Sequence, residues 1–307
     1  MKFIDLKNKL EIASITDPTV LCVGNFDGVH LGHRQLVDSV LLNSEKLKNQ
    51  FPDIRTGAWF FDSTSYKSAN DIYSIHEKID AFADLGLDYA IIADFDEVKS
   101  LSPEEFVQCV LTNDCKCIHA VCGENFRFGS RAMGDAKMLS ELMNGNTSII
   151  SLLSIDGCVV SSTYIRELLS QGEIERANLL LGDNYSICEK VVHGKALGRK
   201  LGIPTVNQNV TNKKIILKNG IYSTICTLDG NKYFGVTNVG TRPTVENTDH
   251  KNVETYLIAF EGECYDKEIK IEFLSRVRDE MKFESVEALT NQIKKDISTT
   301  KAYFNIQ

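Results

Sequence analysis

Two histidines, His30 and His33, stand three residues apart in the segment 24–33, which reads GNFDGVHLGH. At the start of a helix, residues with this spacing project from one face. The unpaired backbone N–H groups and the dipole of a helix N-terminus favour anions there. Two imidazoles can also donate hydrogen bonds as negative charge moves onto a departing pyrophosphate. The segment therefore predicts a site that breaks the α–β bond of a nucleotide; for an isolated H-x-G-H, two exposed histidines at a helix start are the alternative.

The residues around the histidines complete this predicted nucleotide site. Gly28 and Gly32 allow a close backbone approach that side chains would block. Gly24, Phe26 and Asp27 follow a short apolar run, so they stand where a strand passes into a helix. In a doubly wound sheet this junction lies beyond the carboxyl ends of the strands, where ligands bind. We expect these five residues to lie around the phosphates of the nucleotide.

A further phosphate-binding segment is predicted at residues 161–166, which read SSTYIR. The hydroxyls of Ser161, Ser162 and Thr163 can cap a helix that starts at about Thr163, and the remaining hydroxyls and N–H groups can meet phosphate. Arg166 adds a permanently charged, bidentate phosphate donor. A plain helix cap followed by a surface arginine is the alternative when this motif stands alone.

The glycine-rich segment 193–207, which reads HGKALGRKLGIPTVN, predicts a second phosphate-binding loop. Its glycines permit a loop that lays backbone N–H groups against phosphates, and its cations supply positive charge. The residues expected to bind phosphate are Gly194, Lys195, Gly198 and Arg199, with Lys200 and Gly202 in the same loop. An ordinary turn is the alternative for this loop taken alone.

Thr205 and Asn207 end this segment two residues apart, so on an extended chain their side chains point to the same side. A hydroxyl and an amide oxygen that converge there suit Mg²⁺ bound to ATP, because magnesium prefers hard oxygen ligands. Val206 faces away on this interpretation. We therefore predict that Thr205 and Asn207 form a magnesium site.

Glu254 is the only charged residue on one face of a strand-like run that also carries Tyr256, Ile258 and Phe260. A carboxylate at the end of such an apolar stripe is either a surface group at a strand end or a poised general base. The residues alone leave both readings open, and the surface group is the commoner one.

The first half of the chain alternates strand-like and helix-like runs, which predicts an α/β domain with a doubly wound parallel sheet. Ser102 followed by Pro103 and two acids is a good helix start. The expected strands cover residues 20–24, 56–61, 89–93 and 119–122, and the expected helices cover residues up to 49 and 74–85.

From about Ser186 the chain shows short alternating strands divided by turns, with Asp229 and Gly230 as a strong hairpin signal. This half predicts a small antiparallel β-barrel, followed by an amphipathic helix over residues 284–303. We place the domain boundary near Asp183, which gives domains 1–183 and 184–307.

Composition restricts the expected partners and location. The chain has 307 residues, 43% of them hydrophobic, and a formal net charge of -8, which disfavours nucleic-acid and anionic-membrane surfaces. The charged N-terminus resembles neither a signal peptide nor an anchor. Nine scattered cysteines without a C-x-x-C pair are typical of reduced thiols. We expect a cytoplasmic protein without nucleic-acid or membrane partners, and weak homo-oligomerisation is left open.

The motifs together resemble a known family, the bacterial bifunctional riboflavin kinase/FAD synthetases (FMN adenylyltransferases). The histidine segment resembles that of the H-x-G-H nucleotidyltransferases, and the segments 102–106, 123–129 and 161–166 match in order. Residues 193–207 resemble the riboflavin kinase motif, and residues 235–244 and 278–283 match further segments. The resemblance covers essentially the whole chain.

This resemblance implies two activities, each using ATP and Mg²⁺: phosphorylation of riboflavin to FMN, and adenylylation of FMN to FAD with release of pyrophosphate. It implies an N-terminal nucleotidyltransferase domain followed by a riboflavin kinase barrel. By resemblance, Asn125 helps to hold nucleotide and flavin beside Arg127, His30 and His33 act on the triphosphate, and Glu254 accepts the proton of the ribityl hydroxyl. Arg242 contacts either phosphate or a structural partner.

One departure from the family pattern bears on function. Family members usually carry F-x-P-H-P after the second strand, whereas residues 61–65 read FDSTS here. The first alternative is thus a riboflavin kinase with an impaired adenylyltransferase half. A non-catalytic flavin-binding regulator is the second, and it predicts loss of His30, His33 or Glu254, all of which are present. A different H-x-G-H transferase, acting on a pantetheine phosphate, leaves the second half unexplained.

Overall fold

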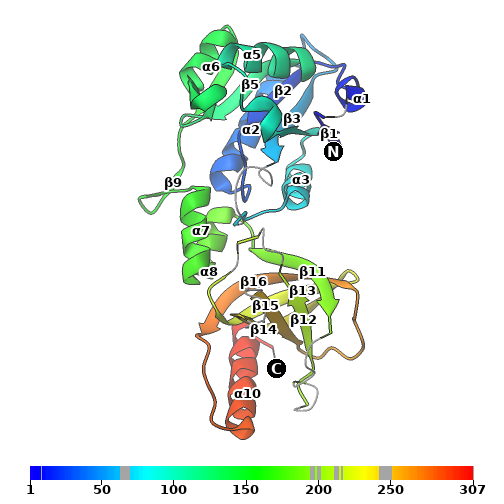
Figure 1. The fold of residues 1–307 in the computed structure, drawn as a ribbon, viewed down its shortest axis with the longest axis vertical. Coiled ribbons are helices and arrows are strands. Elements are labelled where there is room, and N and C mark those ends of the chain that lie inside the picture. The colour runs from blue at the N-terminus through cyan, green and yellow to red at the C-terminus, as the bar shows by residue number, and fades with distance from the viewer. Residues whose placement is uncertain are drawn as a thin grey trace. The chain divides into compact units, whose positions relative to one another are not determined.

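The protein, seen in a computed structural model, consists of two compact units, Met1–Ser162 and Thr163–Gln307 (Figure 1). The structure describes residues 1–7, 9–62, 70–193, 198, 202–210, 214–215, 217–241 and 251–306. Helices α7 (Ser162–Gln171) and α8 (Ile174–Leu181) fall almost wholly in the second unit. Asn178 of α8 donates a hydrogen bond to the Phe273 carbonyl, which ties this helix to the barrel. The predicted boundary after Asp183 divides the chain into catalytic domains, not into compact units, and it stays a prediction.

The first unit is built on one sheet of six parallel strands in the order β1-β4-β3-β2-β5-β8. This confirms the predicted doubly wound parallel sheet. The strands are β1 (Lys2–Asp5), β2 (Thr19–Val23), β3 (Arg55–Asp62), β4 (Tyr89–Asp94), β5 (Cys117–Gly123) and β8 (Thr147–Ile150). The two edge strands, β1 and β8, were not expected, because each is only four residues long and partly exposed.

Helices cover both faces of this sheet, since successive strand residues point to opposite faces. Phe60 packs on Phe82 of α3 (Ile75–Asp84), on the face that α2 (Leu31–Leu47) also covers. Trp59 meets Phe106 of the π-helical segment η2 (Phe106–Asp114) on the other face. The remaining elements of this unit are α1 (Lys9–Ile12), α4 (Phe95–Val98), α5 (Pro103–Glu105), η3 (Ser130–Ala132), α6 (Ala136–Leu142), β6 (Arg127–Phe128), β7 (Gly134–Asp135), β9 (Ser154–Ile155) and β10 (Cys158–Val159).

The predicted helix start at Ser102 is confirmed. The Ser102 hydroxyl accepts a hydrogen bond from the Glu105 N–H, and the Glu105 carboxylate accepts one from the Ser102 N–H. Pro103 occupies the first turn, where its missing N–H costs nothing. The helix then continues as η2, whose buried side chains join the main hydrophobic core.

The second unit contains a closed antiparallel barrel in the order β11-β12-β15-β14-β13-β16, as the sequence predicts. The strands are β11 (Ser186–Val192), β12 (Thr205–Asn209), β13 (Gly220–Leu228), β14 (Asn231–Thr241), β15 (Lys251–Leu257) and β16 (Glu268–Arg278). Asp229 and Gly230 join β13 to β14 with φ angles of 49° and 79°, as a type I′ turn requires, which confirms the predicted hairpin.

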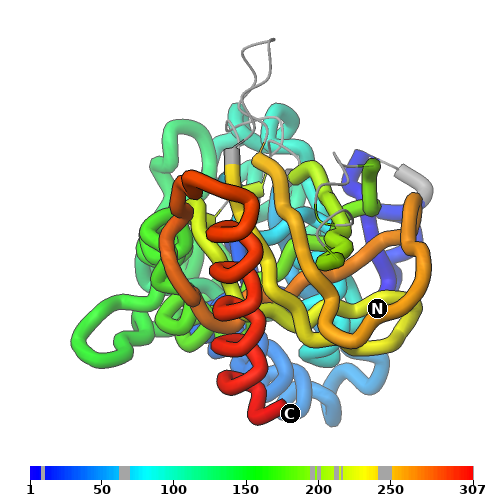
Figure 2. The backbone as a smooth tube through the Cα atoms, turned by 90° about the horizontal axis from the view of Figure 1, so that it is seen from below, coloured from blue at the N-terminus to red at the C-terminus, as the bar shows by residue number. Residues whose placement is uncertain are grey.

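The C-terminal helix α10 (Val286–Tyr303) packs against the outside of the barrel, along β13, β14 and β16 (Figure 2). Ser285 caps its N-terminus by accepting a hydrogen bond from the Ala288 N–H at 3.1 Å. The buried hydroxyls of Ser223 and Thr300 lie 2.9 Å apart and join the helix to β13. The predicted C-terminal amphipathic helix is therefore observed, two residues shorter at its start.

Candidate active sites

The turn between β2 and α2 lies at the carboxyl end of a central strand, because β2 stands between β3 and β5. Phe26, Gly28 and Val29 adopt positive φ angles of 52°, 82° and 38°. Two of these residues are not glycine, and such a conformation is costly unless the surroundings hold it. The buried Phe26 ring does so, since it packs edge-on against His33 and Phe82 with ring centroids 5.1 and 5.2 Å apart.

His30 and His33 begin α2 together, as the sequence predicts. His30 is the N-cap of the helix, and its Nδ1 accepts a hydrogen bond from the His33 backbone N–H at 3.3 Å. The two imidazoles stack with their centroids 3.6 Å apart. Gly32 makes room for this arrangement, because a Cβ there would come within 3.3 Å of the His30 ring. Gly24 similarly makes room for the Phe26 ring, at 3.1 Å.

Both imidazoles are held in the neutral form. Burial lowers the pKa of His30 to about 4, against the opposing pull of the Asp27 carboxylate. Burial also lowers the pKa of His33 well below its usual value, and the nearby charges of His30 and Lys78 lower it further. A neutral imidazole carries one N–H donor. The pair can therefore donate hydrogen bonds to phosphate oxygens at neutral pH.

Asp27 holds the turn in place from its buried position. Its carboxylate accepts hydrogen bonds from the backbone N–H groups of Ile72, at 2.9 Å, and Tyr73, at 3.1 Å. Its own carbonyl accepts a hydrogen bond from the Ser162 hydroxyl at 2.8 Å. The turn is thus joined to residues 70–73 and to the predicted phosphate segment at Ser161 and Ser162.

The other residues predicted for this site lie on two further elements. Asn125 and Arg127 follow β5, the neighbour of β2, at the same edge of the sheet, and Arg127 is exposed. Thr163 and Arg166 lie on α7, in the second compact unit. The segment 63–65, where the family pattern has proline and histidine, lies outside the described residues.

Lys78 belongs to the same neighbourhood, although sequence reasoning missed it. It is 1% exposed, and its Nζ donates a hydrogen bond to the Asn25 carbonyl at 3.2 Å. The ammonium group also lies 5.8 Å from the centre of the Phe60 ring. A lysine four residues before the core residue Phe82, on the buried face of a short helix, was the signal available in the sequence.

A second candidate site lies on the outer face of the barrel, where strands and α10 enclose a cavity of about 300 Å³. Three strands supply the polar floor. Glu254 on β15 pairs with Asn207 on β12 and with Asn238 on β14, and directly paired residues of antiparallel strands share a face. In the next row, Tyr256 pairs with Thr205 in the same way. The structure thus brings Thr205, Asn207 and Glu254 to one surface.

Val206 lies on the opposite face of β12, paired with Thr255. The Thr255 hydroxyl belongs to a buried chain inside the barrel, 2.9 Å from that of Thr237, which lies 2.8 Å from that of Thr224. Gly198 also lines the cavity. A Cβ there would collide with the Ile203 carbonyl and lie 3.2 Å from the Thr205 hydroxyl, so the close approach requires glycine. Gly194, Lys195, Arg199 and Arg242 lie outside the described residues.

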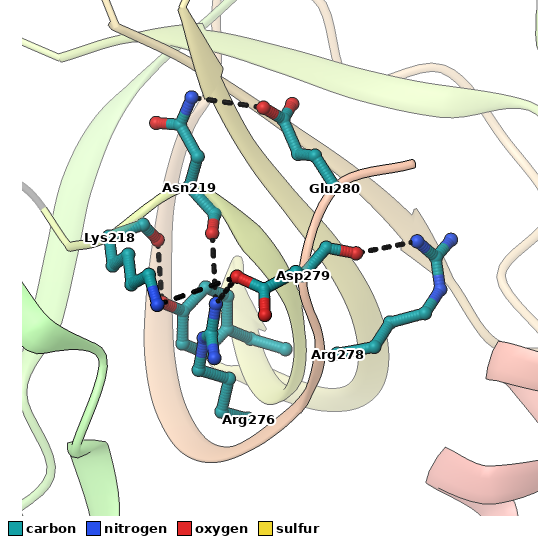
Figure 3. A network of polar contacts seen from close by, with 7 residues as sticks. Lys218, Asn219, Arg276, Arg278, Asp279 and Glu280 are labelled. Carbon is teal, nitrogen blue, oxygen red and sulfur yellow. Dashed lines mark hydrogen bonds and ion pairs between the residues drawn. The ribbon is translucent and has the colours of Figure 1, made fainter. Parts of the chain in front are cut away.

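The loop after β16 forms one wall of the cavity and is anchored where it leaves the strand. Arg278 makes two hydrogen bonds to the buried Asp296 carboxylate of α10, at 2.9 and 2.7 Å. Figure 3 shows further contacts at the same place, where Asn219 donates to Glu280 at 2.9 Å and accepts from Arg276 at 3.2 Å. Asp279 accepts from Arg276 at 2.5 Å.

A second cavity of about 350 Å³ shares Thr205 with the first. Its apolar wall includes Val191, Leu257 and Phe260. Glu261 and Glu263 also line this second cavity, so both cavities combine apolar side chains with carboxylates, and Thr205 stands between them.

Comparison with known proteins assigns a family to both halves of the chain. The family model described as FAD synthetase matches residues 12–164, and that described as riboflavin kinase matches residues 181–304. A bifunctional riboflavin kinase/FMN adenylyltransferase of Bacillus subtilis is 33% identical over 298 residues, which cover 94% of this chain and 93% of the relative. The chain belongs to the bifunctional riboflavin kinase/FMN adenylyltransferase family.

Other family members and one solved structure extend this likeness over the full length. The Escherichia coli bifunctional riboflavin kinase/FMN adenylyltransferase is 30% identical and covers 94% of this chain and 93% of the relative. A crystal structure titled as a macrolide-efflux protein from Streptococcus pneumoniae has a TM-score of 0.88 at 25% identity, over 98% of this chain and 99% of that one. In the part of the chain that the structure describes, no helix is long and apolar enough to cross a membrane.

Proposed function

We propose that this member of the family makes FMN at the barrel site and FAD at the histidine site, with ATP as the second substrate of both reactions. The observation that carries the proposal is the coexistence of two groups of reactive side chains in one chain. The first group is the stacked, neutral pair His30 and His33 at the start of a helix. The second group is Glu254, which lies on the same face of the barrel as Thr205 and Asn207.

At the barrel site, the Glu254 carboxylate accepts the proton of the riboflavin ribityl hydroxyl while that oxygen attacks the γ-phosphorus of ATP and ADP leaves. Glu254 lines the cavity that we assign to the flavin. The second cavity, which Val191, Leu257 and Phe260 line together with Glu261 and Glu263, offers apolar surface for stacking and polar groups for hydrogen bonds, and we assign it to the base of ATP. This division places the phosphates over Thr205, between the two substrates.

The donor set at Thr205 and Asn207 fits a hard cation, because a hydroxyl and an amide oxygen share one face beside the phosphates. We propose Mg²⁺ as that cation. When bound, magnesium neutralises charge on the transferred phosphoryl group. Thr205 and Asn207 would hold it with ATP, while Glu254 remains available to the hydroxyl.

At the histidine site, a phosphate oxygen of FMN attacks the α-phosphorus of ATP and pyrophosphate leaves. The neutral imidazoles donate hydrogen bonds to the departing pyrophosphate, where negative charge grows. Backbone N–H groups at the start of α2 favour the same anion. We propose that Asn125, Arg127, Ser161, Thr163 and Arg166 supply further phosphate contacts, with residues 1–183 as the catalytic domain.

The finer expectations about partners and location are part of this proposal. Nine scattered cysteines without a C-x-x-C pair support a reducing compartment and hence the cytoplasm. The net charge of -8 supports small-molecule substrates over nucleic acid or membrane lipid.

The test is to incubate the pure protein with ATP and Mg²⁺, with riboflavin or FMN in separate reactions, and to resolve the flavins by chromatography. We expect FMN from riboflavin and FAD from FMN, and neither product when a chelator removes the metal. FMN without FAD would leave a riboflavin kinase with a silent first half. Neither product would refute both assignments.

A further inference from the structure

Asn252 touches the carboxylate that we assign as the base of the kinase. It lies two residues before Glu254 on β15, so both side chains stand on the same face of the strand. Its Nδ2 donates a hydrogen bond to Glu254 Oε1 at 2.9 Å. A carboxylate accepts but does not donate, so the amide nitrogen, and not the oxygen, must face Glu254.

The position of Asn252 is unusual for an asparagine. Its side chain is 6% exposed, in the middle of a three-stranded ladder where it pairs with Asn209 and Gly240. Asparagine is depleted in strands, where β-branched residues pack better. The buried Oδ1 atom has no hydrogen-bond partner among the described residues, which lowers stability. A residue that breaks the local rules beside a reactive group is explained by function better than by folding.

We propose that Asn252 is a positioning residue of the kinase: it holds one oxygen of Glu254 and thereby aims the other at the substrate hydroxyl. This inference rests on the proposed role of Glu254 as base. A glutamate side chain has three rotatable bonds, and proton transfer requires the acceptor within hydrogen-bond reach of the hydroxyl. A fixed donor on the same strand restricts the carboxylate to one orientation before the substrate arrives.

The first experiment compares steady-state kinetics of riboflavin phosphorylation in Asn252→Ala, Asn252→Asp and the unmodified protein. We expect kcat to fall about 10- to 100-fold in Asn252→Ala, the range for a misplaced catalytic group, while KM for riboflavin and ATP changes less than about threefold. Asn252→Asp keeps the shape of the side chain but removes the donor, so its kcat should fall at least as far. Wild-type kcat in Asn252→Asp, or a loss confined to KM, would overturn the proposal.

A matched control separates positioning from stability. Thr224→Val removes a buried side-chain hydrogen bond inside the same barrel, on the face away from the cavity. It should lower the thermal stability of the barrel and leave kcat unchanged. If Thr224→Val lowered kcat as much as Asn252→Ala at equal loss of stability, a purely structural role for Asn252 would be established instead.

A double-mutant cycle with Glu254→Gln tests whether Asn252 acts through the carboxylate. The two single variants should each lower kcat, and Asn252→Ala should lower it no further in the Glu254→Gln background. Additive losses would show that Asn252 acts by another route. Full kinase activity in Glu254→Gln would instead refute the proposed base, a result distinct from failure of the Asn252 variants alone.

Discussion

At the start of α2, two imidazoles remain uncharged because the surrounding protein excludes water from them. Burial is the first cause of the lowered pKa in both His30 and His33. The neutral state suits a hydrogen-bond donor to phosphate, but it makes the first unit sensitive to acid. Chemistry and stability are thus linked at the same two side chains.

This link predicts how the free energy of unfolding depends on pH. Unfolded His30 binds a proton near pH 6.5, whereas folded His30 binds it near pH 4. Between these values the unfolded state holds more protons, so stability falls as the pH drops from about 6.5 towards 4. The loss from His30 alone approaches about 3 kcal/mol at the lower end.

Trp59 provides the measurement, because it is the only tryptophan in the chain and is buried in the first unit. Urea unfolding followed by its fluorescence should give a midpoint that falls between pH 6.5 and 4.5. His30→Gln should make that dependence weaker. An equal slope in both proteins would contradict the neutral state of His30.

Among the individual residues, the sequence predicted roles for the histidines, Thr205, Asn207 and Glu254, because each belongs to a recognisable motif, and the structure brings the members of each group together. It could not identify Asn252 or Lys78, whose partners depend on side-chain geometry. Nor could it show that Gly24 and Gly32 make room for aromatic rings, since that depends on the rotamers of Phe26 and His30.

At the scale of elements, contacts between the end of β16 and α10 fix one wall of the cavity of about 300 Å³. The pair Arg278 and Asp296 joins them, and the Asp296 carboxylate is also held by Gln292 at 2.9 Å. Asp296→Ala leaves the half-buried Arg278 guanidinium without its carboxylate partner, which costs up to about 3 kcal/mol, the lower bound for a fully buried pair. We expect the barrel to be destabilised by that amount and the kinase to lose activity with it.

The neighbouring pair provides the control. Asp279 is exposed and pairs with Arg276, so Asp279→Ala should barely change the unfolding of the barrel. The unfolding of both variants is followed by circular dichroism. Trp59 lies in the first unit, so its fluorescence does not report the unfolding of the barrel. Equal stability of the two variants would contradict a structural role for the Arg278–Asp296 pair.

Close packing between strands in the first unit makes a separate prediction. A Cβ on Gly57 of β3 would lie 2.9 Å from the Leu21 side chain and 3.0 Å from the Tyr89 carbonyl. Gly57→Ala therefore forces the neighbouring strands apart, at a cost of about 1–3 kcal/mol. The urea midpoint reported by Trp59 should fall, and an unchanged midpoint would show that the sheet accommodates the methyl group.

The order of elements was largely predictable because buried parallel strands and hairpin turns leave strong local patterns. Asp229 and Gly230 illustrate this, since only residues tolerant of positive φ suit their turn. The short edge strands β1 and β8 carry too few buried residues to produce such a pattern. The sequence also could not predict that η2 is a π-helix, because that depends on which backbone N–H and carbonyl groups pair.

At the scale of the whole molecule, each half of the chain matches the family of one reaction. FMN is the product of the second half and the substrate of the first. Each half has its own group of predicted catalytic residues, His30 and His33 in the first and Glu254 in the second. A substitution in one group should therefore spare the reaction of the other.

The most direct test uses two variants, His33→Ala and Glu254→Gln, assayed singly and mixed with riboflavin, ATP and Mg²⁺. Singly, His33→Ala should make FMN but no FAD, and Glu254→Gln should make neither product from riboflavin yet convert supplied FMN to FAD. Mixed in one tube, the two proteins should together convert riboflavin to FAD. A folded single variant that loses both reactions, or a mixture that makes no FAD, would contradict the assignment of two separate sites.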